Sequence, residues 1–103
     1  MSVLMNLTIF PTDKGESVSE YVSQVIEYIR SSDVPYQLTS MCTIIETETM
    51  DEALTLVRGA YAILEPHADR VYCSLTMDVR KGKSDRIKKK IESVEQRIGK
   101  ISK

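Results

Sequence analysis

Hydrophobic and polar residues change their spacing along the chain in a way that predicts four extended and three helical segments. Residues 3–10 are rich in strand-forming side chains and end at Pro11, which favours a strand. Residues 70–80 alternate apolar and polar side chains at nearly every step, as a strand with two different faces does. Residues 35–47 read as extended with a break near Thr39–Ser40, which predicts two strands or one bulged strand.

Two of the helical segments begin at capping boxes. The first follows an S-x-x-E motif that starts at Ser17, and it is expected to end near residues 31–33 because Pro35 disfavours helix at the residue before it. The second follows a T-x-x-E motif that starts at Thr49, and this helix is expected to end before Pro66. Both carry an apolar stripe at helical spacing, so both are expected to pack on a sheet.

A third helix is predicted near the end of the chain, where Ser84 can cap its first turn. Its apolar residues recur at the spacing of a single helical stripe: Ile87, Ile91, Val94 and Ile98. The rest of its surface is Lys, Arg and Glu.

The resulting order, βαββαβ followed by a helix, predicts an α+β fold of the ferredoxin-like type with an additional C-terminal helix. A single domain is expected over residues 1–103. The sheet is expected to be antiparallel, with the first strand central and the last strand beside it. Right-handed crossovers place the first two helices on one face of this sheet.

The face of the sheet away from the helices is then open, and alternation indicates which side chains line it. Met5, Leu7 and Ile9 are expected to face the helices. The opposite face collects polar side chains with a few apolar ones among them: Asn6, Thr8, Ser74, Thr76 and Asp78, with Leu4, Phe10 and Tyr72.

The middle strand adds either Thr43 and Ile45 or Ile44 and Glu46 to the open face, because a bulge near Ser40 would change its parity. A mixed polar and apolar face favours a subunit interface with polar pockets. A face covered only by water is the alternative.

Length and composition describe an ordinary globular chain, with 103 residues, 42% hydrophobic and 28% charged. No apolar run is long enough to span a membrane, and the N-terminus does not resemble a signal peptide, so a cytoplasmic location without membrane contact is expected. Cys42 and Cys73 are expected to be small buried side chains. With no CxxC motif and one histidine, neither a metal site nor a cofactor is expected.

Charge is distributed unevenly along the chain. Residues 1–69 hold eleven acidic and three basic residues, whereas residues 70–103 hold four acidic and eleven basic ones. The segment RKGKSDRIKKK, residues 80–90, raises the hypothesis of nucleic-acid binding through phosphates. It has no interleaved aromatic residue for base stacking, so we favour an ion-paired helix face and expect no nucleic-acid partner.

A carboxylate on a strand that faces other protein needs a partner. Glu46 can accept a hydrogen bond from the exocyclic amine of a heteroaromatic ring and pair with a protonated ring nitrogen. A salt bridge to Arg70 or Arg80 is the alternative. Glu46 and Asp78 could also act as paired carboxylates of an acid/base enzyme, but no nucleophile–base pair accompanies them and we predict that the protein is not an enzyme.

Four stretches of the chain together resemble the thiamine-binding protein family: KGESVSEYV, YQLTSMCTIIETETMDEAL, DRVYCSLTMDVRKGK and IESVEQRIG. The resemblance covers nearly the whole chain. The residues that match the family pattern are Gly15, Ser17, Ser19, Tyr21, Val22, Tyr36, Leu38, Met41, Thr43, Glu46, Arg70, Val71, Asp78 and Arg80.

The resemblance implies a ferredoxin-like subunit that forms a dimer or tetramer through its sheet. It also implies binding of thiamine or its hydroxymethylpyrimidine moiety without catalysis, for carriage, storage or sensing. Thr43 and Glu46 are the ligand residues it suggests, and the face argument adds Asn6 and Asp78. The helix start at Ser17 and Ser19 is a candidate anion site. The alternative is a structural or regulatory homo-oligomeric module without a thiamine ligand.

Overall fold

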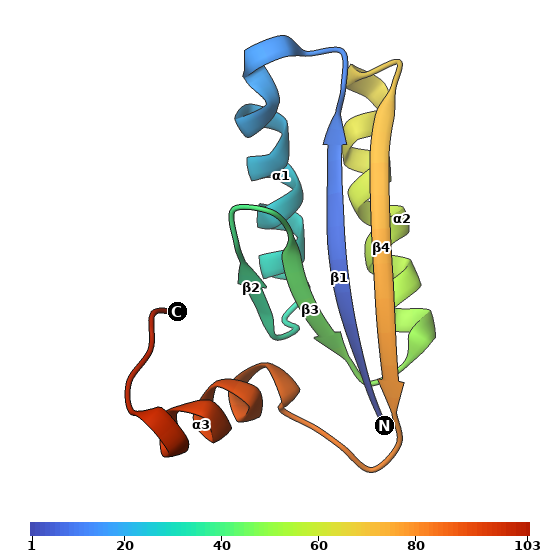
Figure 1. Cartoon of the computed structure of the whole chain (residues 1–103). Coiled ribbons are helices and arrows are strands. Elements are labelled where there is room, and N and C mark those ends of the chain that lie inside the picture. The colour runs from blue at the N-terminus through green and yellow to red at the C-terminus, as the bar shows by residue number, and fades with distance from the viewer.

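The computed structural model describes residues 1–103 as four strands and three helices (Figure 1). Short 3₁₀ turns at Gly15–Ser17 and Glu65–His67 flank the first two helices. The elements, in chain order, are β1 (Ser2–Pro11), α1 (Val18–Ser31), β2 (Tyr36–Leu38), β3 (Thr43–Thr47), α2 (Met50–Leu64), β4 (Val71–Arg80) and α3 (Arg86–Ile98).

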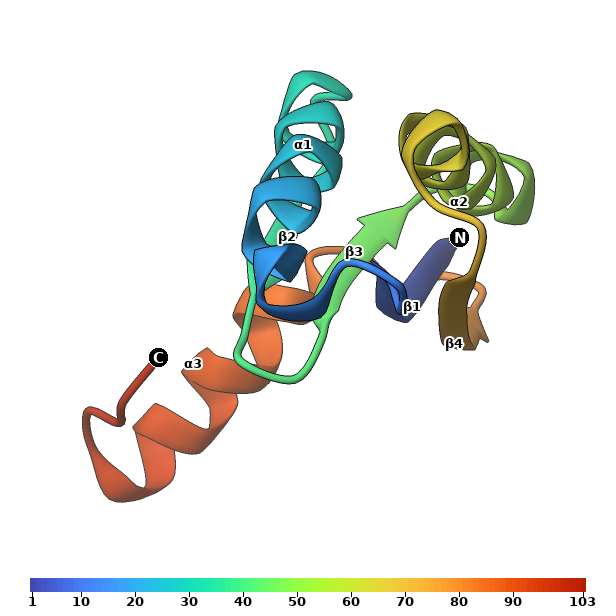
Figure 2. The ribbon, with the colours of Figure 1, turned by 90° about the horizontal axis from the view of Figure 1, so that it is seen from above.

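The four strands form one antiparallel sheet in the order β2-β3-β1-β4. Figure 2 shows α1 and α2 side by side on one face of the sheet, while α3 lies on the other side. The predicted ferredoxin-like α+β fold with an additional C-terminal helix is therefore confirmed, and so is the central position of β1.

The hydrophobic core lies between the sheet and the two covering helices. Every second residue of β1 contributes to it, as the alternation predicts. The buried core side chains are Val3, Met5, Leu7, Ile9, Val25, Ile29, Ile45, Ala53, Leu56, Ala60 and Leu64.

Strand register decides the parity of β3. Met5 lies opposite Ile45, and Leu4 lies opposite Glu46. Because opposed residues share a face, Thr43 and Ile45 point toward the helices and Glu46 points to the open face. Of the two alternatives for the middle strand, the second is therefore correct, and Thr43 does not share a face with Glu46.

β1 is twice as long as β3, and this mismatch leaves part of β1 with a neighbour on one side only. β1 pairs with β4 over all ten of its residues, but it pairs with β3 only from Val3 to Leu7. Beyond Leu7 the chain of the β2–β3 loop takes the place of a strand. There the Thr8 hydroxyl donates to the Met41 carbonyl over 3.0 Å.

The helix starts agree only in part with the capping motifs. The Thr49 hydroxyl accepts a hydrogen bond from the Glu52 N–H at 3.1 Å, so this cap is confirmed. Ser17 precedes α1 without a side-chain cap. The residue before α3 is Asp85 in a left-handed conformation, and Ser84 does not cap this helix. Both of these capping predictions were wrong.

The edge strand β4 keeps its helix-side residues partly uncovered. Leu75 and Val79 are 37% and 42% exposed, although they point to the same side of the sheet as the core. Cys73 is exposed and Cys42 half-buried, and both are free thiols, so the expectation of two buried cysteines was wrong. Cys73 lies on β4, the outer strand of the sheet, which has a neighbouring strand on one side only.

The side chain of Tyr28 on α1 lies against Gly59 of α2. A Cβ atom at this position would lie 2.0 Å from the hydroxyl oxygen of Tyr28 on α1. We predict that Gly59→Ala destabilises the protein but stabilises the Tyr28→Ala variant by about 1 kcal/mol, because alanine is the better helix former once the ring is gone. Denaturant unfolding of the four proteins checks this, and an effect of the same sign in both backgrounds would contradict it.

Candidate functional site

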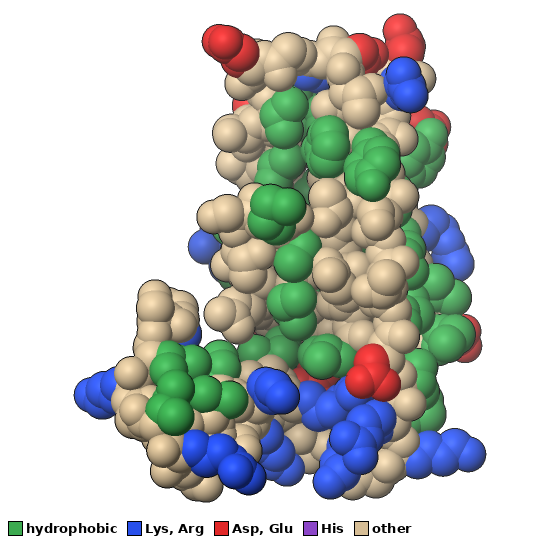
Figure 3. All heavy atoms as spheres, viewed as in Figure 1, with side chains coloured by type: hydrophobic (Ala, Val, Ile, Leu, Met, Phe, Trp, Pro, Cys, Tyr) green, Lys and Arg blue, Asp and Glu red, His purple; other side chains and the backbone are tan.

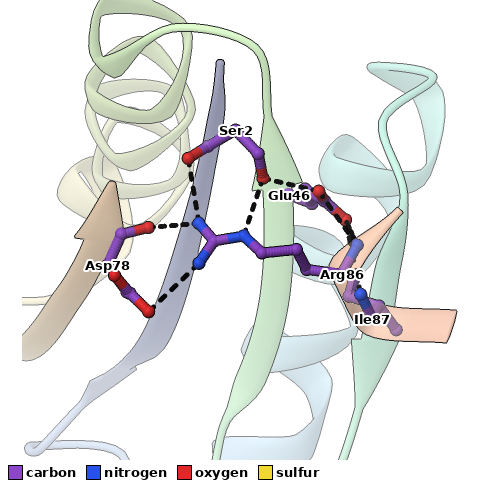
Figure 4. Close-up of polar contacts among 5 residues, drawn as sticks. All are labelled: Ser2, Glu46, Asp78, Arg86 and Ile87. Carbon is purple, nitrogen blue, oxygen red and sulfur yellow. Dashed lines mark hydrogen bonds and ion pairs between the residues drawn. The ribbon is translucent and has the colours of Figure 1, made fainter. Parts of the chain in front are cut away.

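Glu46, at the end of β3, is a buried carboxylate that caps the start of α3 (Figure 4). Its oxygens accept hydrogen bonds from the Arg86 N–H at 2.9 and 3.2 Å and from the Ile87 N–H at 3.4 Å. The Ser2 hydroxyl donates to the same carboxylate over 2.6 Å. Free N–H groups at a helix start favour a negative charge. Since Asp85 makes no side-chain hydrogen bond to the first turn of α3, the Glu46 carboxylate acts as the cap of this helix.

The Arg86 side chain extends these contacts across the end of the sheet. Its Nε donates to the Ser2 hydroxyl at 3.0 Å, and a terminal nitrogen donates to the Ser2 carbonyl at 2.9 Å. The guanidinium also pairs with the Asp78 carboxylate at 3.0 Å and donates to the Asp78 carbonyl. Arg86 therefore ties α3 to β1 and β4, and Glu46 ties it to β3.

These contacts set the protonation of Glu46. Burial raises its pKa, but hydrogen bonds from the Ser2 hydroxyl and from the N–H groups of Arg86 and Ile87, together with the positive charge of Arg86, outweigh burial. The pKa of Glu46 therefore lies below its ordinary value of 4.5, and the residue is ionised at neutral pH.

The sequence correctly indicated that Glu46 needs a partner, but the partner is Arg86 rather than Arg70 or Arg80. Glu46 and Asp78 contact different parts of the same residue, because Glu46 accepts from the backbone N–H of Arg86 and Asp78 pairs with its guanidinium. Ser2 and Arg86 are the residues of this cluster that sequence reasoning missed. No signal in the sequence indicated them, because Ser84 offered a local cap for the same helix.

The other predicted site residues lie apart from this cluster. Asn6 is exposed on the open face, between Ile44 and Thr76 of the neighbouring strands. Ser17 and Ser19 are exposed at the start of α1 and make no side-chain contact that would position an anion.

Thr43 lines a different region, which we call the α1 cleft, where the edge of β1 that faces β3 has no strand partner. It is a cavity of about 230 Å³ between α1, the upper part of β1 and the β2–β3 loop. Eleven of the fifteen lining residues are hydrophobic, so its walls suit a flat apolar ring. The residues on its walls are Leu7, Thr8, Ile9, Phe10, Val18, Val22, Val25, Ile26, Ile29, Leu38, Thr39, Ser40, Met41, Cys42 and Thr43.

The loop that closes the α1 cleft is held in shape by Thr39. Its hydroxyl accepts from the N–H of Cys42 at 3.1 Å and donates to the carbonyl of the same residue at 2.8 Å. Met41 and Leu38 are 83% and 55% exposed at the mouth. The cleft therefore has a structured polar turn on one side and an apolar rim.

A larger hollow of about 760 Å³ lies beside the Glu46 cluster and is mostly polar. Asp33, Glu48, Glu52 and Asp85 line it, together with Lys83. No set of three or more histidine, cysteine, aspartate or glutamate side chains is arranged to hold a metal ion. This hollow is thus an acidic surface next to the base of α3.

The fold and the α1 cleft define a small ferredoxin-like protein with a ring-sized apolar cavity. The family model described as thiamine-binding protein matches residues 5–95. The chain belongs to this family, and its membership supports a thiamine-related role. No helix combines the length and the apolar character that crossing a membrane requires.

Several relatives cover almost the whole chain. A UPF0045 protein of Methanothermobacter thermautotrophicus is 33% identical over 98 residues, covering 93% of this chain and 99% of its own. The crystal structure of MJ1052 from Methanocaldococcus jannaschii has a TM-score of 0.81 at 33% identity, covering 92% and 97% of the two chains.

A second solved structure shares the fold. TM0486 from Thermotoga maritima, provisionally assigned to thiamine biosynthesis or salvage, has a TM-score of 0.79 at 23% identity. The alignment covers 91% of this chain and 99% of that one.

The carboxylate of Glu46 is predicted to keep α3 helical and attached. None of the residues of α3 is buried, and an isolated helix of 13 residues is only marginally stable in water. Glu46→Gln should therefore reduce the helical circular-dichroism signal and cost roughly 1–3 kcal/mol, because an amide cannot accept from all of these donors. Glu48→Gln, at an exposed neighbour, is the control and should change neither.

The same contact predicts a pH dependence. Because the pKa of Glu46 is lowered by folding, its stabilising contribution is complete above the ordinary value of 4.5 and is lost as the pH falls through the lowered value. The α3 signal of the wild type should fall on acidification, whereas that of Glu46→Gln should be low and flat. A wild-type helix signal that stays unchanged in acid would contradict the role of the carboxylate.

Proposed function

We propose that this protein binds thiamine or its hydroxymethylpyrimidine moiety in the α1 cleft and does not transform it, serving carriage, storage or sensing. The observation that carries the proposal is the coincidence of the cleft with the residues of the family pattern. Val22, Leu38, Met41 and Thr43 belong to that pattern and line the cavity. The chemistry of the walls supports the same ligand, because a substituted pyrimidine is flat and largely apolar on its faces.

The open face of the sheet is the alternative place for the ligand, and it carries Asn6, Glu46 and Asp78. Against this location stands the fact that Ser2 and Arg86 already engage both carboxylates. A ligand amine would have to displace the start of α3 to reach Glu46. The role of these three residues as ligand contacts remains a prediction, and the titration below separates the two locations.

The open face supports a second part of the proposal, which is assembly. Figure 3 shows hydrophobic side chains on α3 and on the upper sheet facing the same side, with a column of further hydrophobic side chains between them and a polar area beside this column. A second copy lying on this side would cover both apolar areas. We therefore propose a dimer or tetramer that uses the open face as one of its contacts.

Calorimetric titration with thiamine and with hydroxymethylpyrimidine tests the binding proposal. The wild type should bind, and Val22→Phe should weaken binding at least about tenfold, because the new ring fills the cleft. Glu46→Gln and Asp78→Asn should bind as the wild type does. Mass spectrometry of the recovered ligand should show no change.

Two outcomes would contradict the proposal. If neither thiamine nor hydroxymethylpyrimidine binds up to millimolar concentration, the proposed function is wrong. Normal binding by Val22→Phe with loss in Glu46→Gln would move the ligand to the open face.

Light scattering after gel filtration tests the assembly. The wild type should be larger than a monomer, and Thr76→Lys, in the middle of the open face, should reduce its mass. A monomeric wild type at tens of micromolar would end this part of the proposal.

A further inference from the structure

The unpaired part of β1 presents backbone hydrogen-bonding groups to the α1 cleft. The Thr12 N–H donates to the Arg70 carbonyl at 2.9 Å, on the β4 side. In an antiparallel pair the N–H and C=O groups of successive residues point to alternate edges. With continuous register along β4, the groups of Ile9 therefore point away from β4, to the side where β3 would have continued.

Nothing in the chain pairs with these two groups. The ladder with β3 stops at Leu7 and Thr43, and neither the loop nor any side chain bonds to the backbone of Ile9. Ile9 is nevertheless only 7% exposed and lies on the wall of the cleft. Buried backbone donors and acceptors are almost always paired, so this pair of groups is suited to a ligand.

Proline limits the hydrogen-bond pattern of this edge to one donor. The next residue that would point an N–H to the same side is Pro11, which has none. The cleft therefore offers one N–H donor and one C=O acceptor side by side, both from Ile9.

A third polar group comes from β3. The Thr43 side chain points to the helix side and makes no hydrogen bond within the chain. Because no enclosed side-chain oxygen of the protein lacks a partner, the Thr43 hydroxyl must reach the open space of the cleft. It can donate to or accept from a ring substituent.

We infer that the Ile9 backbone reads the amine–nitrogen edge of a 4-aminopyrimidine, with Thr43 contacting a neighbouring substituent. The exocyclic amine donates to the Ile9 carbonyl, and the adjacent ring nitrogen accepts from the Ile9 N–H. The cavity of about 230 Å³ holds one substituted ring, so the thiazolium half of thiamine extends through the mouth. This inference rests on the proposed function and names the part of the ligand that is recognised.

A series of pyrimidines tests the inference on the wild-type protein. Replacing the 4-amino group of hydroxymethylpyrimidine by an oxo group turns the donor into an acceptor and should weaken binding roughly ten- to hundredfold, because the Ile9 groups are then left unpaired. Thiamine and hydroxymethylpyrimidine should bind within about threefold of each other. Equal binding of the amino and oxo compounds would overturn the inference and leave the proposed function standing.

A matched pair of variants tests the hydroxyl. Thr43→Val keeps the side-chain shape and should weaken hydroxymethylpyrimidine binding several-fold, whereas Thr76→Val, on the open face, should not. If Thr43→Val binds normally, Thr43 has no part in recognition. If neither thiamine nor any of the pyrimidines binds the wild type, the result contradicts the proposed function itself.

Discussion

The structure depends on a difference in length between two neighbouring strands. β1 is paired with β4 along all ten residues but with β3 along only five, so the upper half of the central strand is bare on one edge. The apolar face of α1 continues past the end of β3 and, together with the β2–β3 loop, encloses the α1 cleft. A cavity next to an unpaired strand edge combines apolar walls with fixed hydrogen-bonding groups, which is what a heteroaromatic ligand needs.

Two side chains near the ends of β3 point to opposite faces of the sheet and make different contacts. Thr43 begins the strand and points to the helix side, into the α1 cleft. Glu46 is three residues further along and points to the open face, where its carboxylate caps α3 and is supported by Ser2 and Arg86. A period of two along a strand makes such a division inevitable for residues an odd number apart. The lining of the α1 cleft and the attachment of α3 therefore use opposite faces of one strand.

Local patterns predicted the features that depend on neighbours in sequence. Alternation in residues 70–80 and the Thr49 cap were visible because each is decided within a few residues. The cap of α3 was not, because it comes from Glu46, 40 residues away from Arg86. The exposure of Cys73 depends on the position of β4 at the edge of the sheet, and the parity of β3 depends on the loop before it. The bare edge at Ile9 follows from the relative lengths of two strands, which composition does not reveal.

The most direct test of this account is the amide resonance of Ile9 in a titration of isotope-labelled protein with hydroxymethylpyrimidine. The account predicts that the Ile9 N–H signal moves downfield and reaches saturation, together with signals from Thr43 and the loop around Met41. It also predicts that the resonances of Arg86 and Ile87 stay in place. Shifts confined to Arg86, Ile87 and the end of β4, with Ile9 unmoved, would show that the ring binds on the other face of the sheet.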